Sequence, residues 1–314
     1  MPDPARRPLR CRPLVALLMG RPTVPPLAWL LGALIAALIT ALSGAATAAQ
    51  TPPVAQGCPP AGTSRAELRA LAADGWRLPD EARRHTLALA LVPCLGEPDP
   101  ELRDELALGA LTAWMRGGAL SVATARALGE QVLPLLAAPD PSGFRAPFAA
   151  LVLAEVARAD RLRPLFSPAE RHAVVDAATR FERGVHDYRG FDRVQGWRHA
   201  VAHGADLLMQ LALNPALDRP ALDLVLDAVA SQATPSTHFY IFGEGERLAR
   251  PVIFVARRDL HDAGFWSGWC GRIALAGRVE AGAPPSLAAL ARQHNAKVLL
   301  LTLYAALQES GDAT

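Results

Sequence analysis

Residues 197–213 read WRHAVAHGADLLMQLAL, and this stretch decides the class of fold. At 100° per residue, apolar side chains cover most of the surface of a helix built from it. A helix that is apolar over so wide an arc packs between neighbouring helices, so the stretch predicts a helical core. Its polar side chains fall within a stripe about 60° wide: His199, His203, Asp206 and Gln210.

The same rhythm, with apolar residues three and four positions apart, continues along the chain and breaks at Pro, Gly, Asp and Ser. Ser64 is followed by Glu67 at capping-box spacing, and Pro168 follows Ser167 at a first helical turn. Few aromatic residues and many Ala and Leu also favour helices over strands. Helices are predicted near 64–74, 80–92, 99–116, 121–137, 143–160, 168–183, 197–213, 219–231, 244–258, 260–277 and 286–308.

Paired helices joined by short loops predict an all-α fold, either an α-solenoid of stacked, HEAT-like hairpins or a closed helical array. The sequence has no repeat of fixed period, so this arrangement rests on helix and loop lengths alone. The one strand-like run, HFYIF at 238–242, is expected to be a packed loop. We expect a single helical domain over residues 63–314.

The first 48 residues have the layout of a secretory signal peptide. Five arginines precede an apolar run over 27–42, and Ala46-Thr47-Ala48 supplies an A-x-A cleavage site. Cleavage would leave a Pro/Gly-rich linker over 49–62 on a periplasmic or secreted protein. The alternative is an anchor in the inner membrane formed by residues 27–42, near the short end of the roughly 17–25 residues that span a bilayer. A start at Met19 would give a more ordinary signal.

Charge argues against nucleic acid as a partner. The first 48 residues hold five of the 32 basic residues and one of the 30 acidic ones, which leaves 27 basic and 29 acidic residues in the remainder. A formal charge of −2 offers no stripe for binding phosphates.

Three cysteines remain after the predicted cleavage site. An oxidising compartment permits a disulfide between Cys58 and Cys94, which would fasten the linker to the first helices; the alternative is a free Cys58. Cys270 lies in an apolar stretch and is expected to be a buried thiol. No CxxC pair supports a cysteine zinc site.

The polar stripe is the candidate functional centre. His199 and His203 are four residues apart, so both imidazoles could bind one divalent metal such as zinc. Asp206 is three residues from His203 and is expected to accept a hydrogen bond from that imidazole. The alternatives are a polar pocket without a metal, or buried side chains that only hydrogen-bond to loops. Further metal ligands would come from elsewhere: Asp192, His186 and Glu244.

Residues outside the stripe complete the candidate pocket. Arg189, three residues before Asp192, could clamp a carboxylate or phosphate, or tie its own loop down by binding helix C-terminal carbonyls. Glu244 opens a helix, where a first-turn glutamate is an ordinary partner of the helix dipole. Trp197 projects opposite the stripe and is expected in the core.

Several of these segments resemble a bacterial family known as domain of unknown function 2785. The resemblance covers roughly residues 99–275 and rests on ALVLAEVARAD, which ends at Asp160, RGFD at 189–192, GWRHAVAHGADLL at 196–208 and GEGERLA at 243–249. Members of that family tend to carry an acidic residue near position 186, where this chain has His186. The resemblance implies a helical domain and brings no established activity.

The sequence therefore predicts an exported helical-repeat binding or interaction protein with a polar pocket around His199, His203 and Asp206. Its partner would be an unidentified small molecule or protein. The alternative is a metal-dependent hydrolase that uses His199 and His203. The sequence has no Gly-rich phosphate loop, nucleophile elbow or HExxH motif, so it assigns no enzyme class.

Overall fold

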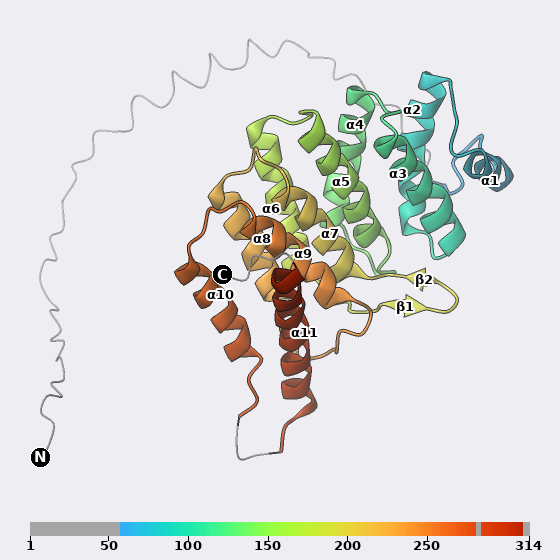
Figure 1. Ribbon diagram of the computed structural model, residues 1–314. Coiled ribbons are helices and arrows are strands. Elements are labelled where there is room, and N and C mark those ends of the chain that lie inside the picture. Colours follow the sequence, from blue (N-terminus) through green and yellow to red (C-terminus); the bar gives the residue numbers. More distant parts are fainter. Residues whose placement is uncertain (1–56, 281–283, 310–314) are drawn as a thin grey trace, which may run out of the picture. The chain divides into compact units, whose positions relative to one another are not determined.

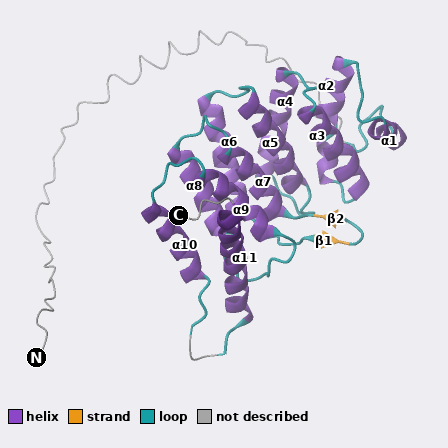
Figure 2. Ribbon diagram, viewed as in Figure 1, coloured by secondary structure: helices purple, strands orange, loops and turns teal. Residues whose placement is uncertain are grey.

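A computed structural model describes residues 57–280 and 284–309 of the chain (Figure 1). The predicted signal peptide and most of the predicted linker lie outside these residues. Within them, the prediction of an all-α protein is confirmed, because the one sheet is a hairpin of two short strands (Figure 2). None of the described helices is both long and apolar enough to cross a membrane.

The described α-helices are α1 (Arg65–Ala73), α2 (Glu81–Ala90), α3 (Gly109–Arg116), α4 (Val122–Val132), α5 (Arg145–Leu162), α6 (Pro168–Arg183), α7 (Ala200–Ala212), α8 (Arg219–Ser231), α9 (Glu244–Ala256), α10 (Ala263–Ala276) and α11 (Leu287–Glu309). Shorter elements are the 3₁₀ turns η1 (Val92–Gly96) and η3 (Leu133–Leu136), the π-helical segment η2 (Glu101–Leu108), and the strands β1 (Phe191–Asp192) and β2 (Gly196–Trp197).

The helices pack in an order that alternates along the chain. One row of neighbours runs through α3, α5, α7, α9 and α11, while α2 packs on α4 and α6 packs on α8 (Figure 1). Such alternation brings every second helix into contact, as stacked hairpins would do. The solenoid or closed array stays a prediction that this order supports.

The row through α5, α7 and α9 holds the centre of the core. Ten of the thirteen residues of α7 are buried, because Ala, Val and Leu occupy nearly its whole circumference, as the sequence predicted. The buried side chains form one continuous cluster that extends from Leu68 in α1 to Leu303 in α11. A polar side chain on α7 is therefore held inside the protein, away from most solvent.

Several predicted helix starts are confirmed by their caps. The hydroxyl oxygens of Ser64 and Ser167 accept hydrogen bonds from the backbone three residues on, and Glu67 and Glu170 complete the two capping boxes. The predicted helix over 99–116 is present, although its first part is the π-helical segment η2. The predicted start of the helix over 197–213 is wrong, because Trp197 belongs to β2, His199 is the N-cap, and the helix begins only at Ala200.

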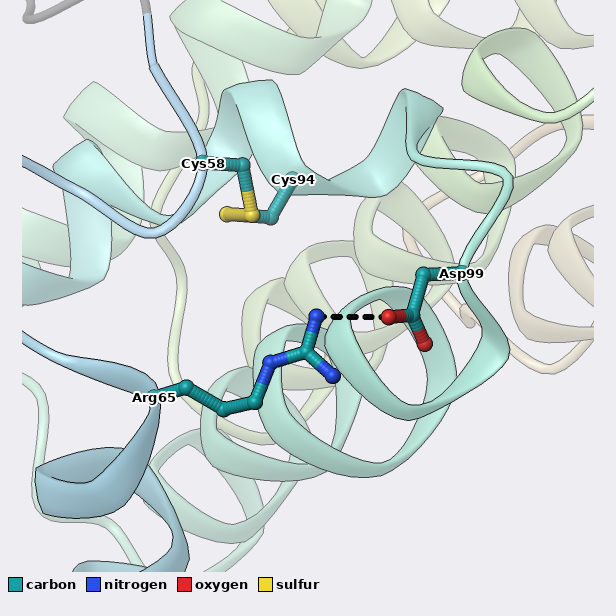
Figure 3. The surroundings of a disulfide bond; sticks show 4 residues. All are labelled: Cys58, Arg65, Cys94 and Asp99. Carbon is teal, nitrogen blue, oxygen red and sulfur yellow. Dashed lines mark hydrogen bonds and ion pairs between the residues drawn. A yellow bond between two sulfur atoms is a disulfide. The ribbon is translucent and has the colours of Figure 1, made fainter.

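The predicted disulfide is present. Cys58 and Cys94 are bonded, and close to them Arg65 Nη2 donates to Asp99 Oδ2 at 2.6 Å (Figure 3). Residues 57 and onward are thereby fastened to η1, across a separation of 36 residues. Cys270 was predicted to be a buried thiol, and it is a free cysteine that is only half-buried.

Candidate functional site

A short hairpin places the first histidine. β1 pairs antiparallel with β2, Phe191 opposite Trp197. The pairing continues beyond the strands, since the backbone N–H of His199 donates to the Arg189 carbonyl at 3.1 Å. His199 then adopts a left-handed backbone conformation, φ 55°, immediately before α7. That conformation is rare for a residue other than glycine, and it turns the chain from the hairpin into the helix.

The hairpin is seated closely against the segment that precedes α9. A β-carbon at Gly190 would overlap the ring of Phe242, so only glycine permits this approach. The Phe242 ring in turn meets Trp197 edge-on, with ring centroids 5.6 Å apart. The contact brings residues from β2, the start of α7 and the start of α9 to one place.

A cavity of about 540 Å³ lies where these elements meet α5 and η2. Its walls are largely aromatic and aliphatic, and its polar groups come chiefly from α7 and α9. Twelve residues line it: Asp104, Leu108, Phe148, Leu151, Trp197, His199, His203, Phe242, Gly243, Glu246, Arg247 and Arg250.

His199 is nearly enclosed in this cavity. Its ring stacks on Trp197, with centroids 4.8 Å apart and planes 20° apart. Its Nε2 lies 3.7 Å from Glu244 Oε1, which is beyond hydrogen-bonding distance, and has no partner. Burial, and then the nearby Arg247 guanidinium, lower the pKa of His199 from 6.5 to about 4. The imidazole is therefore neutral at neutral pH.

Trp197 corrects one expectation. It was predicted in the core, opposite the polar stripe, yet its side chain is 37% exposed and lines the cavity. The helical projection failed there because residue 197 belongs to a strand.

His203 lies one helical turn beyond His199, with ring centroids 5.8 Å apart. Its ring meets Phe148 of α5 edge-on, and its Nδ1 is buried without a hydrogen-bond partner. Burial is the main cause that lowers its pKa well below 6.5, and His199 and Arg247 add to the effect. Each of the two imidazoles is therefore neutral and has one buried nitrogen without a hydrogen-bond partner.

Asp206 does not accept the predicted hydrogen bond from the His203 imidazole. It forms an ion pair with Arg247 of α9, and its Oδ1 lies 3.7 Å from Arg250 Nη1. These contacts cross from α7 to α9. Asp206 lines a smaller cavity of about 350 Å³ beside the first, and Arg247 and Arg250 line both.

The structure places the other candidate residues in local roles. Arg189 pairs with Asp187 and donates to the Ser142 carbonyl at 3.3 Å, so it ties its loop down and does not line the histidine cavity. Asp192 Oδ1 accepts hydrogen bonds from the backbone of residues 194 and 195 and shapes the hairpin turn. Glu244 is buried behind His199, where its Oε2 accepts from the backbone N–H of Phe242 at 2.9 Å.

Glu182 was missed from the sequence. Its side chain is fully buried against α7, where a β-carbon at Gly204 would overlap its carboxyl group. Neither carboxyl oxygen has a hydrogen-bond partner. Burial, and secondarily the charge of Asp206, raise its pKa well above 4.5, which favours the protonated form. A glycine inside the otherwise well-formed apolar helix was the one available signal of this close approach.

Two arginines near the hairpin were also missed. Arg103 of η2 is fully buried and donates to the Glu97 and Gln195 carbonyls at 2.8 Å each. Its guanidinium lies 4.1 Å from the centroid of the Phe144 ring, and that of Arg198 lies 4.2 Å from the same centroid. These cation–π contacts join η2, the start of α5 and the hairpin.

The donor set does not fit the metal centre considered for His199 and His203. In residues 57–280 and 284–309, no group of three or more His, Cys, Asp or Glu side chains could hold a metal ion. Asp192 is engaged in the hairpin turn, and His186 lines a different cavity. The Arg247 guanidinium, close enough to lower both imidazole pKa values, would also repel a cation.

Fold and site together define an all-α protein with an aromatic-walled, histidine-containing cavity at the junction of a hairpin and three helices. The model of a family described as "Protein of unknown function (DUF2785)" matches residues 135–305, more than half of the chain. The chain belongs to this family. The match begins later than the resemblance suggested and continues through most of α11. No curated protein and no solved structure matches the chain.

Proposed function

We propose that the chain is an exported binding protein that holds a small ligand in the cavity between α5, α7 and α9. The observation that carries this proposal is the pair of buried imidazoles, whose His199 Nε2 and His203 Nδ1 have no partner in the described structure. A buried polar atom without a partner costs about 1–3 kcal/mol. Both nitrogens are closed to solvent, so a ligand that met them as the rings turn toward the cavity would recover that free energy on binding.

The lining indicates the class of ligand. A neutral imidazole offers one donor and one acceptor, and Arg247 is already paired with Asp206. The part of the ligand that meets the two imidazoles is therefore neutral, such as a hydroxyl or amide group. The side chains of Phe148, Trp197 and Phe242 would contact an apolar or planar body. The cavity, about 540 Å³, lies within the usual range for small-molecule sites.

Binding can be tested with a library of small heteroaromatic amides and alcohols. Long-range ¹H–¹⁵N spectra of the labelled protein report each imidazole nitrogen, and binders should shift the resonances of His199 and His203 together. His203→Leu should abolish these shifts. The matched control is His172→Leu, since His172 is exposed on α6 and does not line the cavity. Binders that leave both imidazoles unshifted would contradict the proposal.

The export part of the proposal is supported by the order of basic, apolar and small residues over 1–48 and by the Cys58–Cys94 disulfide. The mature chain should then begin near Ala49. Amino-terminal sequencing of protein from the periplasmic fraction checks this. Recovery of the intact chain from the membrane fraction would support an anchor over residues 27–42.

A further inference from the structure

A second cavity, of about 680 Å³, shares no lining residue with the histidine cavity. It lies between α6, η3 and the start of α5. Its walls are mainly apolar and include Leu133, Leu136, Ala173, Ala177, Phe181 and Val185. The binding site proposed above makes no use of it.

Charged groups also line this cavity, and their contacts decide what it can bind. Asp140 accepts hydrogen bonds from Ser142 Oγ at 2.7 Å, from the Gly143 N–H at 3.1 Å and from the Ala146 N–H at 2.9 Å. Asp187 is paired with Arg189. Both carboxylates are therefore held by the protein itself, Asp140 by neutral donors and Asp187 by an ion pair.

Arg180 differs from these two carboxylates. It projects from α6 among the lining residues, it is exposed, and its guanidinium has no ion pair or hydrogen bond with any other described residue. A guanidinium is always charged and binds a carboxylate through two parallel hydrogen bonds. The cavity therefore combines an apolar interior with two carboxylates that are held by protein groups and one arginine side chain that is in no ion pair.

We propose that this cavity binds an amphiphilic anion, with an alkyl chain against η3 and α6 and its carboxylate on Arg180. A straight-chain fatty acid of medium length has this chemistry. His186, which also lines the cavity, is a further polar group of its wall. The site is independent of the histidine cavity, so it can exist whether or not that cavity binds a ligand.

Isothermal titration calorimetry of the whole mature protein with sodium octanoate, decanoate and dodecanoate tests the proposal. Burial of a methylene contributes about 0.8 kcal/mol, so the dissociation constant should fall about fourfold for each methylene added. Dodecyltrimethylammonium, which has the same chain and a cationic head, should bind at least tenfold more weakly than dodecanoate. Equal affinity for both head groups, or no dependence on chain length, would overturn the proposal.

Two variants locate the site. Arg180→Gln should weaken dodecanoate binding at least tenfold, whereas Arg272→Gln, at an exposed arginine of α10, should leave it unchanged. Ala177→Leu should shorten the longest chain that binds, because it fills part of the cavity. His203→Leu should bind dodecanoate as the parent protein does. Unchanged affinity in Arg180→Gln, with an unaltered circular dichroism spectrum, would place the ligand elsewhere.

Discussion

Polar side chains of the amino-terminal helices differ from those around α7 in how far they are buried and in whether they have partners. Around α1 and η2, Arg65 pairs with Asp99 and Glu101, and Arg69 pairs with Glu101, all at partly or largely exposed positions. Around α7, His203 and Glu182 are buried and retain atoms without any partner. The amino-terminal pairs thus have partners but little burial, whereas His203 and Glu182 are buried but have atoms without partners.

These two kinds of polar group differ in their effect on the free energy of unfolding. Exposed ion pairs contribute little, so the amino-terminal region depends mainly on its disulfide and its apolar contacts. Buried groups without partners lower the free energy of unfolding. Such groups gather at functional sites, where binding rather than stability accounts for them. Four predictions test this contrast, from the largest expected effect to the smallest.

The disulfide should matter most. Replacing both cysteines, Cys58→Ala with Cys94→Ala, releases a loop of 36 residues and should lower the free energy of unfolding by about 3–4 kcal/mol in the chain-entropy picture. Urea unfolding measures this, and Cys270→Ala serves as the control. Thiol titration of the unreduced mature protein should find one free cysteine. An unchanged urea midpoint after reduction would mean that the amino-terminal region does not depend on its covalent link.

The second-largest effect should be a loss of stability in acid, caused by the buried histidines around α7. The unfolded chain binds a proton at the ordinary imidazole pKa near 6.5, whereas the folded His199 binds one only near 4. Stability is therefore complete above pH 6.5 and is lost as the pH falls toward 4, by about 2 kcal/mol at pH 5 from His199 alone. His203 acts in the same direction.

Urea unfolding at pH 7.5 and at pH 5 measures this loss. His199→Asn, chosen because asparagine tolerates a left-handed backbone, should remove about 2 kcal/mol of the difference. His172→Asn, at an exposed histidine, should leave the difference unchanged. If His199→Asn keeps the full acid sensitivity, His199 is not held neutral by burial.

Two leucine substitutions should have opposite signs. His203→Leu removes an imidazole whose Nδ1 has no partner and roughly keeps the volume, so it should raise the free energy of unfolding by about 1 kcal/mol. His85→Leu should lower it by about 1 kcal/mol, because His85 Nδ1 is 2.8 Å from the buried Thr124 Oγ1, which would keep only Ser121 Oγ, at 2.9 Å, as a partner. Thermal and urea unfolding of both variants measure the pair. A loss of stability in His203→Leu would show that His203 is a structural residue.

The smallest effect should come from an exposed ion pair. Arg65→Ala removes contacts to Asp99 and Glu101 that are partly exposed to solvent, so the change in unfolding free energy should be close to the error of the measurement and smaller still in 1 M salt. A large loss would mean that the amino-terminal charges act as a network that individual pairs do not reveal.

The features that could be predicted from the sequence are those that depend on residues close together in the chain. The helix starts at Ser64 and Ser167 were predictable because capping uses residues three positions apart. The strong apolar periodicity of α7 likewise revealed its burial. The Cys58–Cys94 pairing was predictable because few cysteines were available.

The rest depends on contacts between distant residues or on elements too short to show a pattern. β1 and β2 have two residues each, which is too few for an alternating signal, so Trp197 and His199 were assigned to the helix. The partner of Asp206 lies 41 residues away in Arg247. Local spacing favoured His203 instead, because a pattern within one helix contains no information about the helix packed against it.

The contacts of Arg103 show that the residues matched by the family model depend on residues outside that match. Arg103 precedes the family match, which starts at residue 135, yet its guanidinium reaches the Gln195 carbonyl and the Phe144 ring within that match. A fragment cut at the family boundary would lose this cation, which leaves the Gln195 carbonyl without its partner and the Phe144 ring with Arg198 as its remaining cation. Such a fragment should therefore be less stable than one that begins before η2.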